Sequence, residues 1–353
     1  MSTSAAALAA LLALAACLCA ALLLLNWWHR LADRRQARVR ETLAPMLASW
    51  RERPATPAQI AWLSALGCED GRSALAACLE TLTDLEPEPA DRVRAALRQS
   101  GLAGREIARL DHRDPARRAS ACRVAGRVRE ADAIPLLTER LRDQAPEVRR
   151  AAVRALGELR AVEAIDAIAE TIEAMGEWTN LLLVMALVRM GPAAAPAVGR
   201  LLAASRSSAM TKALLQVTGR IGVAADPALV RALAAHLEPE VRVEAVRVLG
   251  SVAPDAEAAA VCLGAMDDPE WPVRALAAWA VGRVADDRAL ARLSRAMGDP
   301  AYWVRHHVAV AMGALGEPGA EALRHGLADD NPFVRDMAAQ ALYMRAQRDG
   351  KTA

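Results

Sequence analysis

Histidines are the first residues whose type and spacing could do chemistry, because imidazole nitrogen is a common zinc ligand. Three of the six histidines, His306, His307 and His325, lie in the C-terminal part of the chain. Adjacent helical residues point about 100° apart, so His306 and His307 cannot easily bind one ion. We therefore expect surface or partner-contact histidines and no metal site.

Other signatures of catalysis are absent from the sequence. It has no G-x-x-x-x-G-K or G-x-G-x-x-G phosphate loop and no H-E-x-x-H zinc motif. No two cysteines form a C-x-x-C pair, and those outside the apolar N-terminal segment are expected to be small core residues of a reduced compartment: Cys68, Cys78, Cys122 and Cys262. The net charge of +2 gives no basic field for nucleic acid. The sequence thus predicts neither enzyme activity nor a cofactor.

A repeat is the dominant pattern, and it determines which elements position every side chain. An Arg followed eight residues later by a Gly recurs about every 31 residues, with a Pro usually just before it. The pairs are Arg118/Gly126, Arg149/Gly157, Arg242/Gly250, Arg274/Gly282 and Arg305/Gly313. Arg335 continues the series, and two intervening units carry Asn180 and Thr211 at the Arg position. Such a period is typical of a stacked-repeat solenoid, an extended surface that mostly binds.

Each repeat reads as a pair of short helices. In the unit 143–175, Pro146 suits a helix start, and apolar residues recur on one side from Val148 to Leu156. Gly157 then allows a close approach or a left-handed cap, and a second apolar stripe follows. Neither helix can bury its stripe alone, so neighbouring repeats must stack.

The segments "APEVRRAAVRALGEL", "DPEWPVRALAAWAVGRV" and "DPAYWVRHHVAVAMGAL" resemble the bacterial HEAT-repeat family, in the short-repeat form first known from phycobilin lyases. The resemblance covers roughly 111–345 and implies an all-α, right-handed α-solenoid of about seven to eight helical-hairpin repeats. In such repeats an Asp near the helix start pairs with the Arg of an adjacent repeat. That implies a structural ladder of Asp143, Arg149, Arg242, Asp268, Arg274, Asp299, Arg305, Asp329 and Arg335. Some HEAT-repeat enzymes bind di-iron through His-Glu dipeptides, but no histidine here precedes a Glu.

The N-terminal segment predicts a membrane anchor. Residues 5–25 are consecutive Ala, Leu and Cys, a helix about 31 Å long that matches the hydrocarbon core. Aromatic and basic residues suited to the interface follow: Trp27, Trp28, Arg30, Arg34 and Arg35. The positive-inside rule then favours a single-pass protein of the bacterial inner membrane with its solenoid in the cytoplasm. Two alternatives remain: a cleaved signal peptide, and a lipoprotein modified at Cys17.

The expected organisation has six segments: a short tail at 1–4, the transmembrane helix at 5–25, a basic juxtamembrane segment at 26–44, an atypical helical cap at 45–110, the solenoid at 111–345 and a polar tail at 346–353. The two units without a ladder Arg, at about 176–237, are expected to be softer. Hydrogen exchange would show whether they act as a hinge.

Aromatic residues concentrate between 271 and 343. The candidates for protein interaction are Trp271, Trp279, Trp303, Phe333 and Val310. Three other repeats place an Arg at the position of Trp279, so this side chain is expected to face solvent and act as a hot spot. The alternative is that the aromatics only cover the C-terminal end of the core.

The sequence is therefore interpreted as a non-enzymatic, membrane-anchored scaffold. The layout of one span followed by short HEAT repeats resembles that of bacterial proteins encoded beside membrane glycosyltransferases of exopolysaccharide pathways. That resemblance implies a glycosyltransferase or another envelope-polysaccharide component as partner. There are two alternatives. The first is an enzyme, or a protein that binds a chromophore or another small molecule, that uses the concave face. The second is an exported lipoprotein adaptor.

Overall fold

The structure is a computed structural model that describes residues 27, 34, 36–176, 180–224, 226–252, 255–284 and 287–349. The predicted transmembrane helix at 5–25 and the interface residues Trp28, Arg30 and Arg35 lie outside the described residues. The interface residues Trp27 and Arg34 are described, and both are exposed.

All secondary structure in the described residues is helical. A helix over 36–50 comes first. The elements that follow, with η for 3-10 helices, are α2 (Pro57–Ala65), α3 (Cys68–Thr81), α4 (Pro87–Gln99), α5 (Leu102–Ile107), η1 (Ala108–Asp111), α6 (Pro115–Val128), η2 (Ala131–Ala133), α7 (Ile134–Arg140), α8 (Pro146–Leu159), η3 (Val162–Ala164), α9 (Ile165–Met175), α10 (Asn180–Met190), η5 (Gly191–Ala194), α11 (Ala195–Ala204), α12 (Ser208–Ile221), α13 (Pro227–Leu233), α14 (Pro239–Ser251), α15 (Ala256–Ala265), α16 (Trp271–Val284), α17 (Asp287–Ala296), α18 (Tyr302–Ala314), α19 (Gly316–Gly326) and α20 (Pro332–Asp349). Helix α20 includes residues 346–349, which the sequence assigned to a polar tail.

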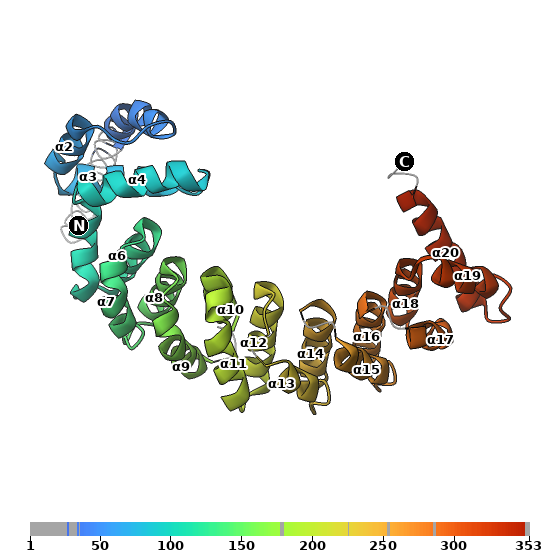
Figure 1. The fold of residues 1–353 in the computed structure, drawn as a ribbon. Coiled ribbons are helices and arrows are strands. Elements are labelled where there is room, and N and C mark those ends of the chain that lie inside the picture. Colours follow the sequence, from blue (N-terminus) through green and yellow to red (C-terminus); the bar gives the residue numbers. More distant parts are fainter. Residues whose placement is uncertain are drawn as a thin grey trace, which may run out of the picture. The chain divides into compact units, whose positions relative to one another are not determined.

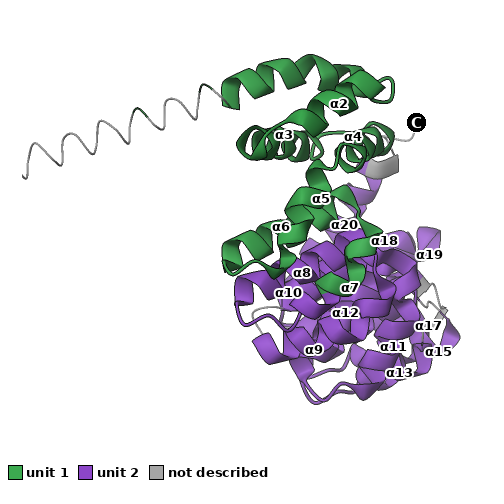
Figure 2. Ribbon diagram, turned by 90° about the vertical axis from the view of Figure 1, so that its left-hand side faces the viewer, with its two compact units in different colours: residues 1–137 green, residues 138–353 purple. Residues whose placement is uncertain are grey.

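Contacts divide the chain into two compact units, residues 1–137 and residues 138–353 (Figure 2). The first unit includes helices α2 to α5, which occupy the expected N-terminal cap at 45–110. Its core contains the fully buried Trp50, whose indole Nε1 donates to Gln59 Oε1 at 3.1 Å. Gln59 also completes a capping box with Thr56 at the start of α2, so one side chain joins a helix cap to the core.

The second unit has two layers of helices (Figure 1). One layer, here called the arginine row, consists of α8, α10, α12, α14, α16, α18 and α20, each in contact with the next. The helices between them in sequence form the other layer, and each packs against a member of the arginine row. These pairs are the helical hairpins that the repeat predicted.

The repeated glycines allow consecutive helices of the arginine row to approach closely. A Cβ on Gly282 of α16 would lie 2.5 Å from Ala311 Cβ and 2.7 Å from Ala311 Cα on α18. Gly250 and Gly157 meet the next helix in the same way, at 2.6 Å and 2.8 Å. The sequence left open whether the glycine serves a close approach or a left-handed cap. At these three positions its role is the close approach.

One apolar stretch in the described residues is long enough to cross a membrane. It spans 25 residues, Asn180–Ala204, and 56% of its most apolar window is buried inside the protein. The stretch is broken into α10, η5 and α11, and α10 packs between α8 and α12. It is therefore weak evidence for a membrane segment.

Candidate functional site

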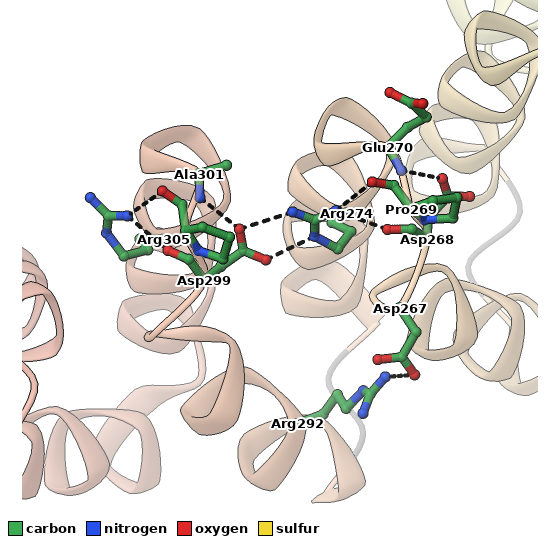
Figure 3. Close-up of polar contacts among 10 residues, drawn as sticks. Asp267, Asp268, Pro269, Glu270, Arg274, Arg292, Asp299, Ala301 and Arg305 are labelled. Atoms are coloured by element: carbon green, nitrogen blue, oxygen red, sulfur yellow. Dashed lines mark hydrogen bonds and ion pairs between the residues drawn. The ribbon is translucent and has the colours of Figure 1, made fainter.

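Two rungs of an arginine–aspartate ladder join consecutive repeats of the second unit. The Arg242 guanidinium donates from Nε and Nη2 to the carboxylate of Asp268, both at 2.7 Å. Arg274 repeats the geometry with Asp299 at 2.8 and 3.1 Å (Figure 3). Both pairs are mostly buried, and each hydrogen bond with its carboxylate raises the pKa of the arginine.

The same arginines also close their own loops. Arg274 Nη1 donates to the carbonyls of Asp268 and Pro269, both at 2.9 Å (Figure 3). Arg149 and Arg335 make the equivalent bonds to carbonyls five and six residues earlier. Asp143 Oδ1 accepts from the Ala145 amide at 2.9 Å. Each ladder residue therefore holds the loop before its helix, which explains why Arg and Asp recur at fixed positions.

The third rung has a different partner. Arg305 Nη1 donates to the carbonyls of Asp299 and Pro300, at 2.7 and 3.0 Å, as in the other repeats. Its Cζ lies 4.3 Å from the ring centroid of Phe333, and its buried Nε has no hydrogen-bond partner among the described residues. Asp329 accepts from the amide of Asn331 at 2.8 Å. An aromatic ring thus covers the guanidinium where the two earlier rungs have a carboxylate.

Four exposed aromatic side chains lie in the first turns of three consecutive helices of the arginine row. Trp271 begins α16, Tyr302 and Trp303 begin α18, and Phe333 is the second residue of α20. Their exposed fractions are 46%, 46%, 53% and 52%. We call these four residues the aromatic surface. Because α18 contacts both α16 and α20, the four side chains lie on neighbouring helices of one edge.

Tyr302 belongs to this surface although the sequence analysis did not single it out. Its ring lies 5.5 Å from that of Trp303 and stacks on His306 at 6.0 Å. Its position immediately before Trp303, in the first helical turn, could have indicated an exposed aromatic residue from the sequence. The contact with His306 required the structure.

Trp279 and Val310, by contrast, are partly buried and less exposed than the four residues of the aromatic surface. A Cβ on Gly250 would lie 3.1 Å from the Trp279 ring, so the indole packs on the preceding repeat. Arg283 covers the same ring at 5.2 Å. The expectation that Trp279 faces solvent is wrong in part. The pattern of α16 alone does not show that Gly250, on the preceding helix α14, leaves room for the indole.

The histidines at the start of α18 take part in aromatic contacts. The rings of His306 and His307 are 5.7 Å apart at 69°, and His306 also meets Trp303 edge-on. Burial, followed by the charge of His306, lowers the pKa of His307. Among the described residues, no group of three or more His, Cys, Asp or Glu side chains could hold a metal ion.

Three of the four described cysteines are buried, as expected: Cys78, Cys122 and Cys262. Burial raises the pKa of Cys78 and of Cys262 to about 12. Cys68 is exposed at the start of α3, so the expectation of a core position is wrong there. Its position as the first residue of a helix, before the apolar stripe begins, accounts for the exposure.

A family model for HEAT repeats matches residues 106–187, 226–302 and 258–343, so the chain belongs to the HEAT-repeat family. None of the curated proteins compared with the chain matches it. Kap95p, solved with RanGDP, is similar with a TM-score of 0.52 and 14% identity over 80% of this chain and 45% of that chain. Kap121p bound to RanGTP is similar with a TM-score of 0.50 and 13% identity over 79% of this chain and 37% of that chain.

The CpcE–CpcF complex of the Nostoc phycocyanin lyase is a more distant match. Its TM-score is 0.34, with 20% identity over 69% of this chain and 94% of that chain. At identities of 13–14%, the similarities to Kap95p and Kap121p show the solenoid fold alone.

Proposed function

We propose that this chain is a non-enzymatic scaffold whose solenoid binds a protein partner through the aromatic surface. The observation that carries the proposal is the exposure of four aromatic side chains on three consecutive helices. Large aromatic groups are enriched among residues that dominate binding energy, and rigid rings lose little entropy on docking. A ladder rung and a close glycine contact join α16 to α18, which carry three of the four aromatic side chains, so this part of the surface is preformed.

The proposal includes a place in the cell. The apolar segment at 5–25 and the arginines after it support a single span in the bacterial inner membrane, with the solenoid in the cytoplasm. Anchoring raises the local concentration of the scaffold beside a membrane partner without adding contacts. The candidate partner is a membrane glycosyltransferase or another envelope-polysaccharide component, in keeping with the family layout.

Similar solenoids supply a precedent for binding, though not for the partner. Kap95p and Kap121p were solved with RanGDP and RanGTP, which are proteins bound by those solenoids. This precedent supports a protein partner over a small-molecule substrate.

The test is in-cell crosslinking with mass spectrometry on the full-length, membrane-bound chain. Trp303→Ala removes an exposed indole, and Leu237→Ala removes an apolar side chain that is 88% exposed in the loop before α14 and is not one of the four residues of the aromatic surface. We expect a membrane protein crosslinked to residues 271–343 in the wild type and in Leu237→Ala. Its recovery should fall about thirtyfold in Trp303→Ala, the effect of losing about 2 kcal/mol at a hot spot.

Equal recovery from the two variants would refute the role of the aromatic surface. A reporter fused after residue 60 tests the topology separately. Cytoplasmic reporter activity is expected, whereas periplasmic activity would refute the membrane orientation and favour an exported lipoprotein.

A further inference from the structure

The guanidinium of Arg305 lies directly beneath the aromatic surface. Its Cζ is 4.3 Å from the ring centroid of Phe333 and 5.9 Å from that of Tyr302, so two of the four aromatic side chains lie against it. Arg305 itself is only 7% exposed, whereas both aromatic residues are about half exposed. A protein that docks on these rings therefore comes close to a buried positive charge.

The hydrogen-bonding capacity of this arginine is only partly used. Nη1 donates to the carbonyls of Asp299 and Pro300, but the buried Nε has no partner, and Nη2 forms no hydrogen bond within the described residues. In Arg242 and Arg274 the same two nitrogens, Nε and Nη2, hold a carboxylate with two parallel bonds. A buried donor without an acceptor is unfavourable, so the fork of Arg305 is preorganised to receive a carboxylate.

The chain does not supply that carboxylate itself. Asp329 stands at the ladder position, but its Oδ1 accepts from the amide of Asn331 at 2.8 Å, and Arg305 Nε remains without an acceptor in the described part of the chain. The ring of Phe333 covers the guanidinium instead. An aromatic ring attracts the positive charge but offers no oxygen to the fork.

We propose that the protein partner presents an acidic side chain, an aspartate or a glutamate flanked by apolar residues, and that its carboxylate pairs with Nε and Nη2 of Arg305. The apolar neighbours would contact the aromatic surface, whose rings exclude water from the ion pair. Charge-assisted bonds of this bidentate kind are about twice as strong as neutral ones. This inference rests on the proposed scaffold role and names the chemistry of its partner.

A carboxylate suits the site better than a phosphate. The two complete rungs hold one carboxylate each at this position of the repeat. Asp329 and Asp330 are both exposed in the loop before α20, and their negative charges oppose a phosphate dianion more than a single carboxylate.

The probe is the peptide N-acetyl-Leu-Glu-Leu-amide, compared with the same peptide containing glutamine. Glutamine keeps the shape of glutamate but carries no charge. The full-length chain is held in nanodiscs of phosphatidylcholine, and empty nanodiscs provide the blank. Saturation-transfer NMR should show saturable binding of the glutamate peptide and binding of the glutamine peptide at least about tenfold weaker.

Two arginine variants locate the site. Arg305→Gln should bind both peptides equally, because the charged fork is lost. Arg335→Gln is the matched control, since Arg335 holds the same position in the next repeat and makes the same pair of bonds to its loop carbonyls. It should keep the tenfold preference for the glutamate peptide. Circular dichroism confirms that each variant is folded.

A second pair of variants leaves Arg305 in place, in case Arg305→Gln does not fold. Phe333→Glu introduces a carboxylate at the residue whose ring covers the guanidinium, and this carboxylate should pair with Arg305 and remove the preference for the glutamate peptide. Phe333→Gln removes the same ring without adding a charge, so it should keep that preference. Because Phe333 is 52% exposed, neither change disturbs the core.

Equal binding of the two peptides to the unaltered chain would overturn the proposal. A preference that persists in folded Arg305→Gln, or that is the same in Phe333→Glu and Phe333→Gln, would do so as well. Tighter binding of N-acetyl-Leu-phosphoserine-Leu-amide than of the glutamate peptide would overturn the choice of a carboxylate.

Trp303→Ala separates this inference from the proposed function. It should weaken binding of both peptides by the same factor and leave the preference for glutamate intact. Unchanged binding of both peptides to Trp303→Ala would count against the aromatic surface and not against the carboxylate site, so the two ideas can fail separately.

Discussion

Substituting Gly282 with Ala tests the close packing of the arginine row. The new methyl group would lie 2.5 Å from Ala311 Cβ and 2.7 Å from Ala311 Cα, where ordinary contacts are 3.4–4 Å. Helices α16 and α18 must therefore separate by about 1 Å, or the surrounding side chains must leave their preferred rotamers. Overpacking of this kind costs about 1–3 kcal/mol.

Gly313→Ala is the matched control. Gly313 occupies the same repeat position on α18, and its added Cβ would meet nothing within 4 Å. Both changes gain about 1 kcal/mol of helix propensity, so that contribution cancels in the comparison. We expect Gly282→Ala to be less stable than Gly313→Ala by about 1–3 kcal/mol.

Urea unfolding followed by circular dichroism on the full-length chain measures this difference. Hydrogen exchange over α16 and α18 shows whether the loss is local, as expected for a repeat protein. Equal stability of the two alanine variants would refute the argument that glycine is needed for close approach.

Three further predictions concern charge, pH and thiol reactivity. Asp299→Ala leaves the mostly buried guanidinium of Arg274 without its carboxylate and should lower the free energy of unfolding by about 2–4 kcal/mol in a urea titration. The control Asp267→Ala removes a carboxylate that is 72% exposed and should lower the free energy of unfolding by less than about 1 kcal/mol. The pKa of His307 is lower in the folded chain than in the unfolded chain, so the free energy of unfolding should fall as the pH drops through about 6.5. A His307→Gln variant should show a flatter profile of melting temperature against pH. A thiol reagent at pH 8 should label the exposed Cys68 in the folded chain. Cys262, whose pKa burial raises to about 12, should react only when the chain unfolds. Rapid labelling of both cysteines, measured by mass spectrometry, would contradict the burial of Cys262.

The sequence predicted the elements of the second unit well because a helix is a local structure. The spacing of Arg274 and Gly282, with an apolar stripe between them, required one helix over these residues, and α16 spans Trp271–Val284. The Asp–Arg spacing, read through the family resemblance, also anticipated the bonds from Arg242 to Asp268 and from Arg274 to Asp299. Fixed spacing within a stacked repeat translates directly into fixed contacts between repeats.

Side-chain environments at the edges of the repeats were less predictable. Trp279 was expected to face solvent because its position is polar in other repeats, yet its indole packs on Gly250 of the preceding helix. Phe333 was expected either to cap the core or to bind a partner. The structure adds a contact that neither expectation included: Phe333 covers the guanidinium of Arg305 and remains 52% exposed.

The sequence by itself determined the class of this protein. A recurring Arg, Gly and apolar stripe can bury its surface only by stacking like helices, so a stacked-repeat solenoid followed from the pattern. The resemblance of the repeats to HEAT sequences, which the family model confirms, then gave the family. Only the tertiary structure decided which residues form sites. The aromatic surface draws its side chains from three neighbouring helices of the arginine row. The distances between these side chains depend on how closely neighbouring helices pack, a property that no single repeat encodes.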